Sequence, residues 1–223
     1  MEPIKLSFVY SQELELQRVV SAAKRIDWYL NHGYRLDWIS FPKILDFGKR
    51  KIFSEAEVLA AIQAEYDKNI FILAATNLDQ LYDPYKTKLA LFIRRLGLPI
   101  ISPIIVTLTR YGMGGGYSLP NSVVVNITQR TEINSLTTTL HEIIHLHLHI
   151  QHLIEKHRVT HWSKEALVNL LFGAAFPDLQ KKDNQIPREV NIEKVKIIYQ
   201  SNFPDIEEII LMVGKINAPE PAI

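Results

Sequence analysis

Residues 140–152 read LHEIIHLHLHIQH, and the secondary structure of this histidine-rich stretch decides the fold around it. Its first part, HEIIH at 141–145, fits the pattern His-Glu-x-x-His, whose two histidines share one face when the segment is helical. Its middle part, HLHLHI at 145–150, alternates polar and apolar residues with the period of a strand. The two interpretations exclude each other, because a strand sends neighbouring side chains to opposite faces.

A helix accounts for the stretch better than a strand does. At about 100° per residue, the apolar residues from Leu140 to Ile154 occupy one broad arc of the helix surface. The polar residues share a narrow stripe: His141, Glu142, His145, His149 and His152. No glycine or proline interrupts residues 131–159, so we expect one helix over about 131–157. His147 alone falls on the apolar arc, where we expect a core histidine with a backbone hydrogen-bond partner.

The first hundred residues predict an alternation of strands and helices. Ser54 and Glu57 have the spacing of a capping box, which starts a helix. Asp83 and Pro84 suit the start of another helix, and Gly97 follows its end. Strands are predicted over 4–10, 34–41 and 70–75, and helices over 13–31, 54–66 and 83–96. The expected scaffold is therefore α/β, with a partly parallel sheet.

From residue 100 onward the pattern changes. The remaining predicted elements are a strand over 101–111, a glycine-rich turn or hairpin over 111–121, a β-branched strand over 122–127, a second helix over 163–175, a loop over 176–189, two helices within 189–215, and a tail over 218–223. We therefore divide the chain into an N-terminal α/β region at 1–100, a core at 101–176 and a C-terminal helical segment at 177–223. We expect the N-terminal region to pack with the core as one domain.

The composition excludes several classes of function. The 223 residues can form one sizeable core, 47% of them are hydrophobic, and the formal net charge is +1. This charge argues against a nucleic-acid-binding protein that relies on a basic surface. No run of about 18 apolar residues and no signal-peptide pattern occurs, so we expect no membrane partner and a cytoplasmic location. There are no cysteines, so any metal must be held by histidine and carboxylate side chains.

A zinc site is the chemistry that the histidine stretch favours. On a helix, His141 and His145 lie one turn apart, which suits tetrahedral zinc, and Glu142 lies beside them. A catalytic zinc needs a third protein ligand, and Glu165 follows His145 after 19 residues, enough chain for a second helix to return. His161, in the connecting loop, is the alternative third ligand.

This spacing of His-Glu-x-x-His, 19 residues and Glu resembles the gluzincin branch of zincin metallopeptidases, over roughly residues 103–175. The resemblance implies one zinc ion per chain, Glu142 as general base, and Asn169 hydrogen-bonded to His141. It also implies an α/β (α+β) zincin-like core, with an active-site helix, a following ligand helix and a mixed sheet. In zincins the substrate pairs with an edge strand, which we assign here to Val123, Val124 and Val125.

Two related branches do not match the chain. Metzincins would need Gly and His where the chain has Leu148 and Gln151, and deformylase-type enzymes use a Cys ligand. Gluzincins usually add a Tyr or His that stabilises the oxyanion. The sequence offers Tyr111, Tyr117, His157, His161 and Tyr199 for this role, and we favour Tyr117 and His161.

The favoured hypothesis is a zinc-dependent hydrolase that cleaves peptide bonds in a peptide or protein substrate. The alternative is a non-catalytic zinc-binding or scaffold protein with a zincin-like fold, although such a protein has no need of Glu142. A third hypothesis is a dedicated hydrolase that acts on one cellular protein or on a non-peptide amide. The sequence leaves the oligomeric state open.

Overall fold

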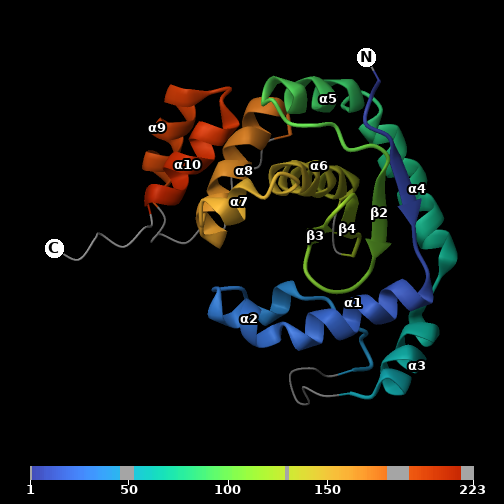
Figure 1. Ribbon diagram of the computed structural model, residues 1–223. Helices are drawn as coiled ribbons and strands as arrows, with labels where there is room; N and C mark the ends of the chain where they lie inside the picture. The colour runs from blue at the N-terminus through green and yellow to red at the C-terminus, as the bar shows by residue number, and fades with distance from the viewer. Residues whose placement is uncertain (1, 46–52, 129–130, 180–190, 217–223) are drawn as a thin grey trace.

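The computed structural model describes residues 2–45, 53–128, 131–179 and 191–216 as a mixed α/β protein (Figure 1). Its strands are β1 (Leu6–Val9), β2 (Ile104–Thr109), β3 (Gly115–Ser118) and β4 (Ser122–Asn126). They form one sheet in the order β1-β2-β4-β3, in which β3 is antiparallel to β4 and the other neighbours are parallel. The sheet is mixed, and its first strand comes from the N-terminal region.

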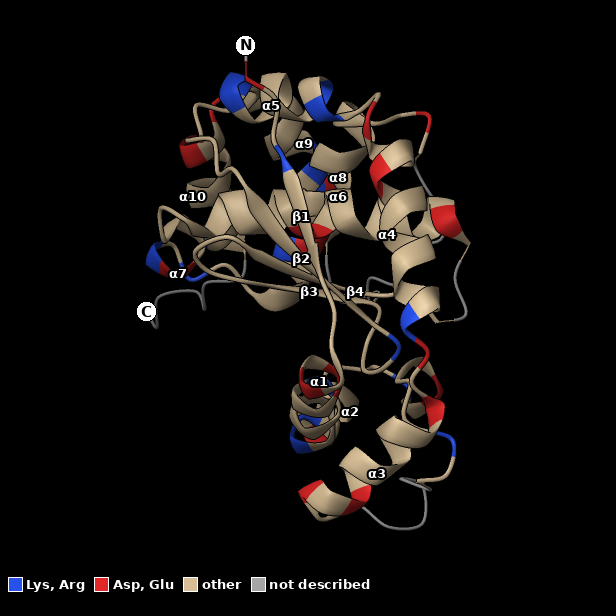
Figure 2. Cartoon of the chain, turned by 90° about the vertical axis from the view of Figure 1, so that its right-hand side faces the viewer, with Lys and Arg blue, Asp and Glu red and all other residues tan. Residues whose placement is uncertain are grey.

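The described helices surround this sheet. They are α1 (Gln12–Lys24), α2 (Ile26–Asn31), α3 (Glu55–Glu65), α4 (Lys68–Tyr82), α5 (Lys86–Arg95), α6 (Glu132–His149), α7 (Leu153–Lys156), α8 (His161–Ala175), α9 (Ile192–Asn202) and α10 (Ile206–Ile216). Helix α6 is central, because it packs against β3, β4, α4 and α8. Helices α1 to α3 lie together below the sheet in Figure 2. Within the described ranges, no helix combines the length and apolar character needed to span a bilayer.

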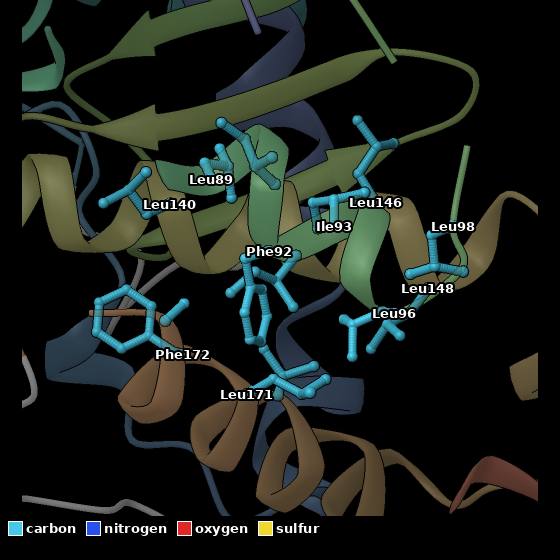
Figure 3. Packing of buried hydrophobic residues seen from close by; sticks show 14 of the residues in the cluster. Leu89, Phe92, Ile93, Leu96, Leu98, Leu140, Leu146, Leu148, Leu171 and Phe172 are labelled. Atoms are coloured by element: carbon cyan, nitrogen blue, oxygen red, sulfur yellow. The ribbon is translucent and has the colours of Figure 1, made fainter. Parts of the chain in front are cut away.

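The histidine stretch is helical, as its periodicity predicts. The side chain of Thr131 caps α6 by accepting a hydrogen bond from the Asn134 backbone N–H. Leucines of α6 pack against α5 and α8 in the main core: Leu140, Leu146 and Leu148 (Figure 3). Burial of each leucine stabilises the fold by roughly 1.5–3 kcal/mol. Helix α6 is therefore held by apolar contacts on most of its circumference.

His147 is a core histidine, as predicted. It is fully buried, its Nδ1 lies 2.7 Å from the Ile143 carbonyl oxygen, and its Nε2 accepts a hydrogen bond from the Ile101 backbone N–H at 3.2 Å. Burial lowers the pKa of its imidazole to about 4, so the ring is neutral at pH 7. It joins α6 to the segment that leads into β2.

The predicted length of this helix was wrong. Helix α6 ends at His149, and residue 152 takes a left-handed conformation, with φ of 53°, before the short helix α7. The His152 side chain is exposed, so the polar stripe of the metal site does not extend to it. A histidine in the left-handed region leaves no proline or glycine signal, which is why the sequence did not mark this break.

Two predicted strands in the N-terminal region are also wrong. Residues 70–75 belong to α4, which the Asp67 side chain caps by accepting from the Asn69 backbone N–H. Phe71 and Leu78, seven residues apart, face the core, while Leu73 is 61% exposed. Residues 34–41 contain a 3₁₀ turn, η1 (Leu36–Trp38), and Ser40 makes only an isolated bridge with Gly112. Before residue 100, β1 is therefore the only strand among the described residues.

The other helix predictions are confirmed with small shifts. The capping box of Ser54 and Glu57 is present at the start of α3. Helix α5 begins at Lys86 instead of 83, because Asp83 closes α4. The predicted helix over 13–31 is divided at Arg25 into α1 and α2. The loop predicted over 176–189 lies mostly outside the described residues, and the tail predicted over 218–223 lies entirely outside them.

A buried carboxyl group joins α1 to the end of β2. Glu15 is 1% exposed, and its carboxyl oxygens accept from the Arg110 backbone N–H at 2.9 Å and the Thr109 hydroxyl at 3.0 Å. Burial raises the pKa of this carboxyl group to about 7, although both hydrogen bonds oppose the shift. The group therefore binds its proton more tightly in the folded protein than in the unfolded chain.

Replacement of His147 by leucine removes the acceptor for the buried Ile101 N–H. We expect the free energy of unfolding to fall by about 1–3 kcal/mol, the usual consequence of an unsatisfied buried donor. Urea denaturation measures this change. Metal affinity, measured on the same samples, stays at the wild-type value, because His147 faces away from the other histidines. A loss of metal binding without loss of stability would contradict the assignment.

Replacement of Glu15 by glutamine tests the buried carboxyl group. Because the folded-state pKa is raised from 4.5 to about 7, stability from the bound proton is fully present below pH 4.5 and is lost as the pH rises toward 7. Glutamine stays neutral, so the unfolding free energy of the variant relative to wild type rises by about 1–3 kcal/mol between pH 4.5 and 8. Glu13→Gln, on the exposed side of α1, serves as the control and shows no such rise.

Candidate metal centre

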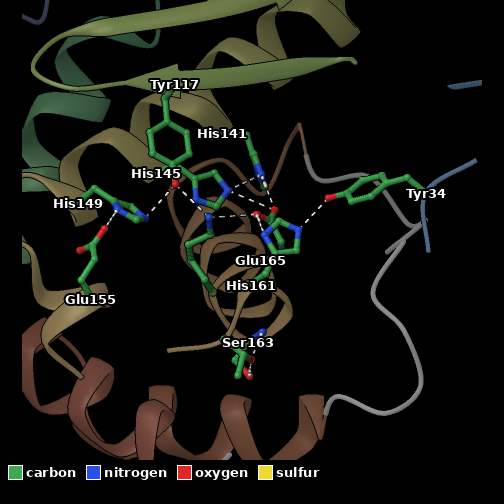
Figure 4. A network of polar contacts seen from close by, with 11 residues as sticks. Tyr34, Tyr117, His141, His145, His149, Glu155, His161, Ser163 and Glu165 are labelled. Carbon is green, nitrogen blue, oxygen red and sulfur yellow. Dashed lines mark hydrogen bonds and ion pairs between the residues drawn. The ribbon is translucent and has the colours of Figure 1, made fainter. Parts of the chain in front are cut away.

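Two helices bring three ligand atoms together. Helix α6 presents His141 and His145, and α8 presents Glu165, capped at its start by Thr160 (Figure 4). The two Nε2 atoms lie 3.0 Å apart, and Oε2 of Glu165 lies 3.4 Å from Nε2 of His141 and 3.2 Å from Nε2 of His145. The residues that sequence spacing selected therefore meet at one point.

These distances fit a tetrahedral ion. Ligand bonds of about 2.0–2.1 Å at tetrahedral angles separate the ligand atoms by about 3.3 Å. The three observed separations, 3.0, 3.2 and 3.4 Å, lie close to that edge length. Among the described residues, His141, His145 and Glu165 form the single group of three or more His, Cys, Asp or Glu able to hold an ion. Two imidazoles and one carboxylate are also ligands that zinc accepts.

The electrostatics of the three side chains suit a cation. Burial lowers the pKa of His145 to about 4, which leaves the neutral imidazole that binds metals. Burial also acts to lower the pKa of His141, but Glu165 and Glu142 outweigh it and raise that pKa. Burial opposes ionisation of Glu165, yet the two histidines hold the pKa of its carboxyl group well below the usual value. The Glu165 side chain is therefore a carboxylate at neutral pH.

Glu142 lies beside His141, His145 and Glu165 and is not one of these three candidate ligands. Burial raises the pKa of its carboxyl group to about 7. The side chain packs against β3, where a Cβ on residue 115 would lie 2.5 Å from Glu142 Oε1 and 2.6 Å from Thr138 Cγ2. Any side chain at position 115 would therefore force the Glu142 carboxyl group or the Thr138 methyl group to shift, so glycine suits this close approach. A carboxyl group that titrates near neutral pH is suited to the transfer of protons.

The site opens into a cavity of about 550 Å³ whose walls come from distant parts of the chain. The N-terminal region contributes one wall: Arg25, Trp28, Tyr29 and Tyr34. Residues 113–117 form a second wall, and it is anchored to α1 because Arg18 Nη2 donates to the Met113 carbonyl at 2.9 Å. Helices α6 and α8 complete the cavity. The N-terminal region thus takes part in the site, which no motif before residue 100 indicated.

Of the five candidates for oxyanion stabilisation, Tyr117 and His161 line the cavity. The Tyr117 ring stacks on His145, with centroids 5.1 Å apart and planes 8° from parallel. His161 Nε2 lies 2.9 Å from the hydroxyl of Tyr34, and its Nδ1 lies 4.0 Å from Glu165 Oε1. In this geometry Glu165, not His161, completes the metal group.

The remaining candidates lie elsewhere. Tyr111 packs in a separate cluster between α1 and α3 and donates to Glu65 at 3.1 Å. His157 and Tyr199 are outside the cavity lining. Asn169 lines the cavity one turn beyond Glu165, but within the described ranges no hydrogen bond joins it to His141, so its second-sphere role stays a prediction.

The predicted substrate-pairing strand requires correction. Val123, Val124 and Val125 lie in β4, which is inside the sheet between β2 and β3. Its backbone groups already pair on both sides, so an added chain cannot pair there. The edge next to His141, His145 and Glu165 is β3, which lies within the glycine-rich turn or hairpin predicted over 111–121 and pairs antiparallel with β4. Of its two glycines, Gly115 is the one that lies against Glu142.

Lys164 and Tyr34 are cavity residues that the sequence did not predict. Lys164 is 9% exposed, and its Nζ donates to the Tyr117 hydroxyl at 2.9 Å and lies 3.7 Å from Glu165 Oε1. Tyr34 reaches His161 across 127 positions of sequence. A lysine directly before a ligand glutamate was a local signal that could have found Lys164, whereas nothing local points to Tyr34.

Comparison of the chain with protein-family models, with curated proteins and with solved structures found no match. The geometry of the site therefore carries the functional argument.

Replacement of Gly115 by alanine tests the contact with Glu142. The new Cβ overlaps the Glu142 carboxyl group and the Thr138 methyl group, so one of them must move. We expect the free energy of unfolding to fall by about 1–3 kcal/mol. Gly116→Ala is the matched control, because its nearest heavy atom, Arg18 Nη1, is 3.9 Å away. Equal stability of the two variants in urea denaturation would be evidence against the overlap.

Proposed function

We propose that the protein is a zinc-dependent hydrolase that cleaves peptide bonds. The observation that carries this proposal is the convergence of His141, His145 and Glu165 at tetrahedral spacing, with the carboxyl group of Glu142 beside them. A site that only stores or senses zinc needs the three ligands but not Glu142. The zincin-like character of the core is part of this proposal and rests on the spacing of these four residues.

One zinc ion per chain would be held by the two Nε2 atoms and the Glu165 carboxylate. When bound, zinc supplies Lewis acidity, which lowers the pKa of water and polarises a carbonyl group. Glu142 accepts a proton from the attacking water and transfers it to the leaving amine. Its position beside the three ligand side chains places its carboxyl group within the same cavity as the reacting groups.

An extended polypeptide is the substrate shape that the cavity favours. Strand β3 ends the sheet, and among the described residues no further strand pairs with its outer edge. A peptide that adds to this edge gains backbone hydrogen bonds that do not depend on its sequence. Gly115 and Gly116 let a second backbone approach β3 closely, because they carry no side chains.

Variants of Glu142 and Glu165 separate catalysis from metal binding. Glu142→Gln keeps about one zinc per chain and loses at least about 100-fold in hydrolysis of fluorescein-labelled casein, because the proton acceptor is gone. Glu165→Ala weakens zinc affinity by at least about 100-fold, because one of three protein ligands is removed. Zinc affinity is measured by competition with a chromophoric chelator.

The matched control is Glu193→Ala, which removes an exposed carboxylate on α9 that pairs only weakly with Lys196, at 4.0 Å. It retains wild-type zinc affinity and hydrolysis. Unchanged zinc affinity in Glu165→Ala would overturn the ligand assignment. Hydrolysis by Glu142→Gln at the wild-type rate would instead overturn the role of the base and leave the metal site intact.

A further inference from the structure

A chain of hydrogen bonds leads from the surface to the metal group. Nδ1 of His149 lies 2.7 Å from Glu155 Oε1, and Nε2 of His149 lies 2.9 Å from the Tyr117 hydroxyl (Figure 4). The same hydroxyl accepts from Nζ of Lys164 at 2.9 Å. Side chains from β3, α6 and α8 and the short helix α7 thus form one connected network.

The order of donors in this network follows from its two ends. The Glu155 carboxylate only accepts, so Nδ1 of His149 donates to it and Nε2 is left as an acceptor. Tyr117 then donates its single proton to His149, and its oxygen accepts from Lys164. The Tyr117 hydroxyl therefore has no proton to offer to a ligand in the cavity. Its ring is fixed as well, because it stacks on His145.

Lys164 is the member of the network with a donor to spare. An ammonium group carries three protons, of which one is directed to Tyr117, and its nitrogen Nζ lies 3.7 Å from Glu165 Oε1. Oε1 is the oxygen of Glu165 that faces away from the two histidines, whereas Oε2 faces both of them. The ammonium group therefore lies beside the metal position, at the wall of the cavity.

We infer that Lys164 is the group that stabilises the negative charge developing on the substrate carbonyl oxygen, and that Tyr117, His149 and Glu155 are its positioning residues. This inference rests on the proposed function. It replaces the expectation that Tyr117 or His161 contacts the oxyanion directly. Lys164 is suited to the task because it is 9% exposed, and a charged donor in a water-poor site stabilises an anion more than one in bulk water.

A merely structural role for Lys164 makes a different prediction. A lysine that only neutralises Glu165 would affect the affinity for the metal itself and would not distinguish charged from neutral ligands of that metal. If Lys164 is instead an oxyanion donor, its replacement leaves the metal affinity unchanged or slightly higher, because the replacement removes a positive charge near the metal position. The discriminating measurement is therefore the affinity of the metal-loaded protein for an anion compared with a neutral ligand.

Cobalt-loaded protein provides this measurement without any substrate. Inorganic phosphate is the anionic probe, imidazole is the neutral probe, and the visible absorption bands of cobalt report the binding of each. We expect Lys164→Met to weaken phosphate binding by at least about tenfold, with less than about twofold change for imidazole and for cobalt. Lys164→Arg restores phosphate binding to within about threefold. Tyr117→Phe removes the hydroxyl that holds the Lys164 ammonium group, and it weakens phosphate binding by about threefold.

Lys156→Met is the matched control, because Lys156 is an exposed lysine that pairs with Glu207 at 3.0 Å, away from the cavity. It binds both probes as wild type does. Wild-type phosphate affinity in Lys164→Met would overturn the inference, as would an equal loss of phosphate and imidazole affinity or a wild-type protein that binds no phosphate.

Hydrolysis of casein by the same proteins separates this inference from the proposed function. If wild type hydrolyses casein and Lys164→Met keeps wild-type kcat and phosphate affinity, the inference fails and the proposed function stands. If phosphate affinity falls as expected but no protein hydrolyses casein, the anion site stands and the peptidase proposal fails. If wild type hydrolyses casein and Lys164→Met also loses phosphate affinity, both proposals stand. Lys164→Met then lowers kcat more than it raises KM, because Lys164 contacts the charge that develops in the transition state.

Discussion

The burial of helix α6 is the constraint on which the rest of the structure depends. The helix lies between the sheet, α4 and α8, so its polar side chains must find partners inside the protein. An unpaired polar group in such a place costs several kcal/mol. His147 meets this demand with backbone groups, and His149 meets it with Tyr117 and Glu155. His141 and His145 turn their Nε2 atoms to Glu165 instead, while the buried Nδ1 of His145 has no hydrogen-bond partner among the described residues. This third arrangement creates the site.

Local patterns in the sequence were enough to predict three features. They are the helix α6, the separate helix α8 that carries Glu165, and the inward-facing side chain of His147. These features follow from helical periodicity and from a capping residue, which act within a few positions. The same kind of pattern misled the prediction at residues 70–75, where an apolar run suited a buried strand equally well. The cap at Asp67 decides for a helix, and the apolar residues left at the surface show that composition was a weaker guide than capping.

The parts of the site that could not be predicted depend on contacts between distant positions. Tyr34 reaches His161, and Arg18 holds the Met113 carbonyl, because α1 and α2 fold back below the sheet. No spacing rule connects these residues. The edge of the sheet was misplaced for a related reason, since strand propensity favours valines and does not register that β3 contains glycine to admit the Glu142 carboxyl group. Motifs thus located the three candidate ligands, and tertiary packing built the cavity around them.

The glycine at position 115 links two events that are usually considered separately. The same few atoms of backbone form the sheet edge and the surface on which the Glu142 carboxyl group rests. A polypeptide that pairs with this edge, as the proposed function requires, would lie against the same residue that the Glu142 carboxyl group contacts. Under the proposed function, the binding of an extended chain and the position of the proton acceptor would therefore both depend on the backbone at residue 115.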